Sequence, residues 1–178
     1  MSDRDEAQAQ QMHLTGPRVS LRPGTVNDVD RLASILREPD VANRWGTFER
    51  GEIEEEIVGD EKVFVIEVDG DVIGAIQYGE EEDPMYRHAS IDIFLTTSRQ
   101  GQGFGSEAIR VLASHLIRVR GHHRLTIDPA ADNEAAIRAY QKVGFRRVGV
   151  MRSYERGPNG TWHDGLLMEM LADEFKEA

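Results

Sequence analysis

The sequence contains no cysteine, which excludes disulfide bonds and thiolate-bound metals among its 178 residues. Long apolar runs are also missing, because none approaches the roughly 18 residues that a membrane-spanning helix needs. Residues 1–11 are polar and acidic rather than basic and then apolar, so we expect no secretory signal there. These absences favour a cytoplasmic protein with no membrane partner.

Basic residues are few, since 21 Lys and Arg stand against 32 Asp and Glu and the formal charge is −11. Nucleic acids and anionic membranes bind basic patches, so we expect neither as a partner. The surplus of carboxylates favours a cationic ligand, although acidity also serves solubility alone. The histidines are not spaced with carboxylates as a metal site requires, and we therefore expect no metal.

The length suits one domain, which we place at residues 16–178, after a polar tail at 1–15 that is predicted to be disordered. Asp69-Gly70 lies between two apolar strands, 63–68 and 72–78, and is the turn pair typical of a hairpin. The following pattern of strand, helix, strand and helix predicts parallel neighbours at 90–95 and 125–127. Strands at 145–154 and 162–170 complete a terminal hairpin.

Residues 90–106 form the most informative stretch of the sequence. Apolar residues alternate along 90–95, as in a strand, and glycines follow at 101, 103 and 105. From Ser106 the apolar residues recur at helical spacing up to Gly121, so the free N–H groups of the first helical turn face the glycines. A strand, a glycine turn and a helix N-terminus together predict a site for phosphate.

Three kinds of glycine loop compete for this turn. A P-loop requires lysine before the final Ser or Thr, but Gly105-Ser106 lacks it, and the dinucleotide fingerprint requires a different glycine spacing. Gln100-x-x-Gly103-x-Gly105 instead resembles the signature of the GNAT N-acetyltransferase superfamily. A second motif supports this resemblance: Asn133-x-x-Ala136-x-x-x-Tyr140, followed by Lys142-x-Gly144-Phe145.

The resemblance implies the fold and the donor. The expected fold is α/β (α+β) of GNAT type: a mixed, mostly antiparallel sheet of six to seven strands, splayed between the fourth and fifth, with helices on both faces. Acetyl-CoA is the implied co-substrate. Its pantetheine amides would pair with the strand backbone, and its pyrophosphate would bind the N–H groups of the glycine turn. The residues expected to bind acetyl-CoA are Ile93, Phe94, Leu95, Gln100, Gly101, Gln102, Gly103, Phe104, Gly105, Ser106, Asn133 and Tyr140.

Two residues are catalytic candidates. Tyr140 shares a helix face with Asn133, and in the family a tyrosine at this place protonates the departing CoA sulfur. Asp92 lies in mid-strand, where a carboxylate is costly unless it is paired or faces a cleft. It could accept the proton of the attacking amine, anchor the ammonium, or lie on an ordinary exposed face.

Within the superfamily, the segments around Trp45, Asp92, Asp128 and Asp164 resemble aminoglycoside 6′-N-acetyltransferases. That likeness implies that these four side chains bind the aminoglycoside, with the acidic loop 80–83 steering the cation, and that acetyl transfer is direct, in a ternary complex. Antibiotic resistance would then be the role. The alternatives are a transferase for a protein N-terminus or a polyamine, and a non-enzymatic acyl-CoA sensor. The edge of the terminal hairpin leaves a homodimer open.

Overall fold

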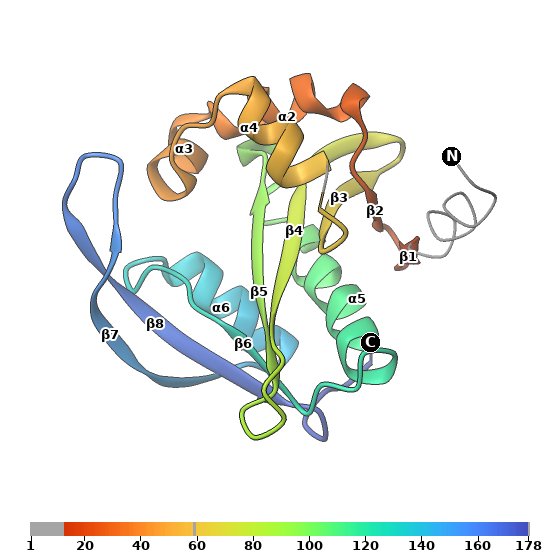
Figure 1. Ribbon diagram of the computed structural model, residues 1–178, viewed down its shortest axis with the longest axis vertical. Helices are drawn as coiled ribbons and strands as arrows, with labels where there is room; N and C mark the ends of the chain where they lie inside the picture. The colour runs from red at the N-terminus through yellow and green to blue at the C-terminus, as the bar shows by residue number, and fades with distance from the viewer. Residues whose placement is uncertain (1–12, 59, 178) are drawn as a thin grey trace.

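The protein is described here by a computed structural model that covers residues 13–58 and 60–177 (Figure 1). Its strands are β1 (Leu14–Thr15), β2 (Ser20–Pro23), β3 (Val63–Val68), β4 (Asp71–Glu81), β5 (His88–Leu95), β6 (Arg124–Ile127), β7 (Arg146–Arg156) and β8 (Trp162–Leu171). Its α-helices are α2 (Val29–Leu36), α3 (Pro39–Trp45), α4 (Arg50–Ile53), α5 (Phe104–Arg118) and α6 (Glu134–Val143). The described residues also form two short 3-10 helices, η1 (Val26–Asp28) and η3 (Thr97–Arg99), and a π-helix, η2 (Glu54–Val58).

Within the described residues the strands form one eight-stranded sheet in the order β1-β2-β3-β4-β5-β6-β8-β7. β5 and β6 run parallel, and the other neighbouring pairs are antiparallel. The parallel pairing is confined to Ala89 with Leu125 and Ser90 with Thr126. Beyond Ser90 the two strands diverge, so the predicted mixed, mostly antiparallel sheet with a splay is confirmed. In the described part of the chain it has eight strands where six to seven were expected, and because the two-residue β1 adds a strand at the edge, the splay lies between the fifth and sixth strands.

Helices cover both faces of this sheet (Figure 1). Alternate residues of β3 point to opposite cores: Phe64 and Ile66 pack with α5, whereas Val63 and Val65 pack with α2, α3 and α4. Because both of its faces are buried, β3 reads as an almost continuous apolar run. The long β7–β8 hairpin, blue in Figure 1, extends away from α5.

The structure differs from the sequence predictions at several boundaries. Leu14–Thr15 pairs with β2 as a strand, so these two residues are not part of a disordered tail, as was expected for residues 1–15. Residues 1–12 lie outside the described part. Helix α5 was expected to run from Ser106 to Gly121, but it begins at Phe104 and ends at Arg118. It starts early because Gly103, inside the glycine turn, is already its N-cap.

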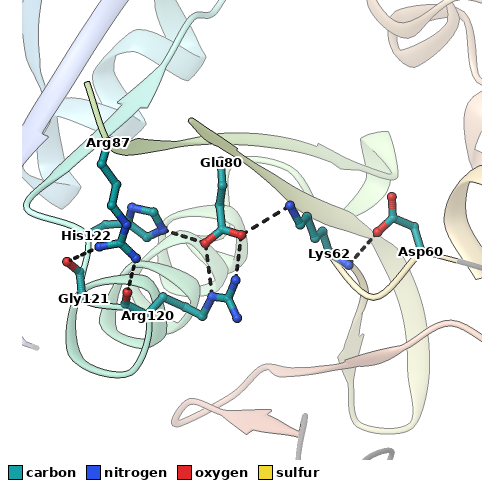
Figure 2. A network of polar contacts seen from close by, with 7 residues as sticks. All are labelled: Asp60, Lys62, Glu80, Arg87, Arg120, Gly121 and His122. Carbon is teal, nitrogen blue, oxygen red and sulfur yellow. Dashed lines mark hydrogen bonds and ion pairs between the residues drawn. The ribbon is translucent and has the colours of Figure 1, made fainter. Parts of the chain in front are cut away.

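The prediction of an acidic loop at residues 80–83 is wrong for its first two residues. Glu80 and Glu81 belong to β4, and the Glu80 side chain is only 3% exposed. Figure 2 shows its carboxylate held between three basic residues. Arg120 Nη2 and His122 Nε2 each lie 2.7 Å from a carboxylate oxygen, and Lys62 Nζ lies at 3.3 Å. Glu80 therefore stabilises the fold and is not available to steer a cation.

Candidate active site

The glycine turn between β5 and α5 presents backbone donors. Gly103 is the N-cap of α5 and has a φ of +88°, a left-handed conformation that favours glycine. The first helical hydrogen bond runs from Glu107 N to Gly103 O at 3.1 Å. The N–H groups of residues 104–106 consequently lie ahead of the hydrogen-bonded turns, where the helix dipole also favours an anion.

The second half of β5 has a free edge toward the splay. Thr96 N donates to Ile73 O, so the backbone groups of Thr96 face β4. The N–H and C=O groups of successive residues in a strand point to opposite edges, and those of Ile93 and Leu95 therefore face the splay. Gln100 Nε2 donates to Leu95 O at 3.0 Å on that side. An amide-bearing chain that entered the splay could therefore pair with this edge as an added strand.

Arg18 lies directly against the glycine turn, a role that sequence reasoning missed. Its guanidinium donates to Gln102 O at 3.2 Å, lies 4.7 Å above the centre of the Phe104 ring and is fixed by Glu107 at 2.8 Å. A Cβ on Gly103 would come within 3.2 Å of Arg18 Nη2. Because Arg18 is 85 positions from the turn in sequence, no local pattern could have indicated this contact.

Two carboxylates lie at the splay. Asp92 is opposite Gln77 of β4, and Asp128 follows the last residue of β6. Although water reaches Asp92, the protein around it desolvates the carboxylate, which raises its pKa, and the charge of Asp128 raises it further. Desolvation also raises the pKa of Asp128, and hydrogen bonding to the Tyr154 phenol opposes that rise. A cationic group placed here would relieve both carboxylates.

Tyr140 of α6 is close to the same carboxylates. Its ring packs edge-on against Phe145 with centroids 6.5 Å apart. Burial raises the pKa of the Tyr140 phenol well above its ordinary value, and the charges of Asp92 and Asp128 add to this effect. The phenol therefore stays protonated at neutral pH and can act as a proton donor.

A cavity of about 1930 Å³ joins the glycine turn to the α3 side of the splay. Trp45, at the C-terminal end of α3, lines it and packs edge-on against Phe94 with centroids 5.0 Å apart. Of the residues predicted from sequence, those lining the cavity are Trp45, Ile93, Phe94, Leu95, Gln100, Gly101, Gly103, Gly105, Ser106, Asn133 and Tyr140.

Five predicted residues do not line this cavity. Asp92 and Asp128 lie beside it at the splay, and Phe104 is buried in the core beneath Arg18. Gln102 turns its side chain to Ser98 O. The Asp164 carboxylate is already engaged, because its Oδ1 accepts the Ser153 N–H at 2.8 Å. Asn133, in contrast, lines the cavity and also caps α6 by accepting the Ala136 N–H at 3.2 Å.

Two further observations concern the described residues, 13–58 and 60–177. They contain no group of three or more His, Asp or Glu side chains arranged to hold a metal ion. In the same part of the chain, no helix is both long and apolar enough to cross a membrane.

Comparison with known families gives one match. The sequence model described as "Acetyltransferase (GNAT) domain" matches residues 18–146, which include the glycine turn, both carboxylates at the splay and Tyr140. The match covers more than half of the chain.

Among individual relatives, the spermidine N(1)-acetyltransferase of Escherichia coli K12 is 27% identical over 115 residues, which make up 65% of this chain and 61% of that protein. The alignment thus spans less than two thirds of that relative's length. The aminoglycoside N(6′)-acetyltransferase type 1 of Klebsiella pneumoniae is 28% identical over 155 residues, covering 75% of this chain and 76% of that one.

A solved structure has the same fold. It is an acetyltransferase from Salmonella typhimurium that modifies the N-terminal serine of ribosomal protein L7/L12. The TM-score is 0.76 at 21% identity, and the superposition covers 88% of this chain and 96% of that one.

Proposed function

Because the chain belongs to the GNAT acetyltransferase family, we propose that it moves the acetyl group of acetyl-CoA onto an amine, most specifically the 6′-amino group of an aminoglycoside. The transfer is direct and occurs in a ternary complex. The observation that carries this proposal is the meeting of Asp92, Asp128 and Tyr140 at the splay, next to a turn built to bind an anion.

The chain's residues fit acetyl-CoA. The N–H groups at the start of α5 and the nearby Arg18 guanidinium suit the pyrophosphate, and the free edge of β5 at Ile93 and Leu95 suits the pantetheine amides. Gly105 leaves this groove open, because a Cβ there would come within 3.2 Å of Leu95 Cδ1. When bound, acetyl-CoA supplies an activated acetyl thioester.

The protein then supplies three functions. Asp92 accepts a proton from the acceptor's ammonium, directly or through water, so that the neutral amine can attack. The Leu95 N–H, which faces the splay, donates a hydrogen bond to the carbonyl oxygen as negative charge develops on it. As the new C–N bond forms and the C–S bond breaks, Tyr140 donates its phenolic proton to the departing sulfur. The second proton that the attacking nitrogen loses on becoming an amide returns through water to the Tyr140 phenolate, and Asp92 releases the first to solvent.

Charge and stacking define the acceptor. An aminoglycoside carries several ammonium groups, and the raised pKa values of Asp92 and Asp128 mean that a cation would stabilise both carboxylates. Trp45 lines the cavity on the α3 side and offers an aromatic face for a sugar ring. The likeness to the Klebsiella pneumoniae enzyme supports this class of acceptor.

A polyamine is the second candidate. The likeness to an Escherichia coli spermidine acetyltransferase favours it, and spermidine would satisfy the same pair of carboxylates without a sugar ring. A protein N-terminus presents one ammonium group and makes less use of two carboxylates.

The test is CoA release from acetyl-CoA with four acceptors: a 6′-amino aminoglycoside, its 6′-hydroxyl counterpart, spermidine, and a peptide with a free N-terminus. We expect turnover of the 6′-amino compound and none of its hydroxyl counterpart. Turnover of spermidine or the peptide alone would move the acceptor to that class. Equal turnover of the amino and hydroxyl compounds would contradict acetylation at the 6′ position.

A further inference from the structure

The pairing of β7 with β8 is irregular near the start of β8. The pairing of the two strands jumps from Met151 with Gly165 to Glu155 with His163. Three β7 residues, 152–154, therefore face the single residue Asp164. A bulge of this kind turns side chains away from the direction that a regular ladder would give them.

Asp164 supports this bulge. Ser153 has a φ of +48°, which is unusual for a residue other than glycine and carries a conformational cost. Its N–H donates to Asp164 Oδ1 at 2.8 Å, so the carboxylate compensates the strained backbone. The next residue along β7, Tyr154, takes its direction from this turn.

Gly165 makes room for the ring that the bulge presents. A Cβ at Gly165 would lie 2.7 Å from Tyr154 Cδ1, closer than real contacts allow. The backbone on either side of Gly165 also holds the loop that follows Asp128: Ala131 N donates to Asp164 O, and Leu166 N donates to Pro129 O, both at 2.8 Å. One short stretch of β8 thus fixes both Tyr154 and the Asp128 loop.

The Tyr154 ring lies next to the loop that follows Asp128, because it packs on Gly165 and Gly165 is paired with Ala130 of that loop. Hydrogen bonding to Asp128 raises the pKa of Tyr154 to about 12, with desolvation adding to it. The phenol therefore stays protonated and has an O–H to offer Asp128, and a carboxylate has a second oxygen for a cation. The nearby charge of Asp92 also acts on Tyr154, so the two carboxylates and this phenol share one environment.

We infer that Tyr154 is a positioning residue that holds the Asp128 carboxylate for a second ammonium group of the acceptor, and that Asp164 builds the bulge beneath Tyr154 instead of binding the acceptor. This inference rests on the proposed function and sharpens it. The acceptor class it selects has two amino groups, one acetylated beside Asp92 and one held by Asp128; aminoglycosides and polyamines both qualify.

Asp164 variants separate the two roles. Asn at 164 has no charge, but its side-chain oxygen can still accept the Ser153 N–H, whereas Ala cannot. We expect Asp164→Ala to raise the acceptor KM about tenfold, with kcat and the KM for acetyl-CoA unchanged, and Asp164→Asn to recover most of that loss. A loss in Asp164→Asn equal to that in Asp164→Ala would mean that the charge itself binds the acceptor, and would overturn the inference.

Tyr154 variants test the other half. Tyr154→Phe keeps the ring over Gly165 and removes the hydroxyl; we expect the KM for spermidine to rise about tenfold, with little change for a monoamine of similar length. Gly165→Ala should reproduce this loss by displacing the ring, and should add nothing in a Tyr154→Ala background. Equal effects on the diamine and the monoamine, or additive losses in the double variant, would contradict positioning.

The outcomes also distinguish this inference from the proposed function. If the wild-type protein turns over an amine and Tyr154→Phe matches it, only the inference fails. If the wild-type protein acetylates no amine, the proposed function fails, and spermidine binding by calorimetry to the same variants still decides the role of Tyr154. Unchanged spermidine affinity in Tyr154→Phe would then overturn it.

Discussion

At the scale of single residues, the site depends on how each side chain's protonation is set by its surroundings. The raised pKa of Asp92 comes first from desolvation and then from Asp128, and burial raises that of Tyr140. A carboxylate that holds its proton more tightly is a stronger base, and a phenol that stays protonated is a usable acid. The two shifts assign the two residues opposite roles.

Asp92→Asn tests the base. We expect kcat to fall by about a hundredfold or more, because the amide cannot accept the amine's proton, while the melting temperature at neutral pH stays the same or rises. Activity of the wild-type protein should increase with pH across the raised pKa of Asp92, and this dependence should vanish in the variant. Glu82→Gln, at an exposed position in the β4–β5 connection, is the control. A large drop in melting temperature would indicate a structural role instead.

Tyr140→Phe tests the acid. The ring that packs on Phe145 remains, so the fold and acetyl-CoA affinity should be kept while kcat falls by about a hundredfold. Steady-state rates and calorimetry check this, with the exposed Tyr86→Phe as the matched control. Wild-type kcat in Tyr140→Phe would remove the phenol from the mechanism.

Sequence alone could identify these residues but not all of their partners. Asp92 was recognisable as an unfavourable strand residue, and Tyr140 by its spacing from Asn133 along one helix. Tyr154 and Arg18 could not be recognised, because one depends on a bulge and the other on a contact far away in the chain. Local patterns carry no information on either.

At the scale of elements, the glycine turn is the part that binds the donor. Gly103→Val should lower acetyl-CoA affinity at least about tenfold in calorimetry, because the side chain meets Arg18 and the residue must abandon a φ of +88°. Gly121 has a similar positive φ of +72° but lies beyond the other end of α5, so Gly121→Val is the control for backbone strain. Equal affinity losses in both variants would contradict a local binding role.

The end of β4 contributes stability rather than binding. Removal of the carboxylate in Glu80→Ala leaves Lys62, Arg120 and the buried His122 without it, and we expect a loss of about 2–3 kcal/mol in the free energy of unfolding. This is below the range for a fully buried pair, since Arg120 and Lys62 are partly exposed. Denaturant unfolding measures it, with the exposed neighbour Glu81→Ala as control.

This contribution also depends on pH. Hydrogen bonding from Arg120 lowers the pKa of Glu80 from 4.5 to about 2. A carboxyl group whose pKa is lowered by folding stabilises the folded state when the pH is above the pKa of the unfolded state. This stabilisation is lost as the pH falls toward the pKa of the folded state. Wild-type protein should therefore lose more stability than Glu80→Ala between pH 4.5 and 2. Parallel losses would show that the network contributes little.

At the scale of the whole molecule, the order of elements was predictable, and their ends were less so. Period-2 and helical patterns indicated seven of the strands and both helices of the donor site, because those segments bury regular faces. The two-residue strand β1 and the early start of α5 were missed, since each depends on tertiary pairing or on glycine conformation. The splay followed from the family resemblance and not from periodicity.

The charges at the splay make the stability of the protein depend on pH in the opposite sense to Glu80. Asp92 and Asp128 have raised pKa values, so their contribution is present at low pH and is lost as the pH rises above 3.8 through the raised values. Asp92→Asn should flatten this decline in thermal unfolding. Spermidine should stabilise the wild-type protein more at pH 7 than at pH 4, and an equal effect at both would contradict a carboxylate site.

The central claim is that this cleft transfers acetyl from acetyl-CoA to an amine nitrogen. The most direct measurement is mass spectrometry after incubation of the protein with acetyl-CoA, isotopically labelled in its acetyl group, and the four acceptors separately. We expect one labelled acetyl group on an amine nitrogen of a polycationic acceptor, and labelling slowed about a hundredfold or more when Asp92→Asn replaces the wild-type protein under single-turnover conditions. Tight binding of acetyl-CoA without a labelled product on any amine would contradict the account.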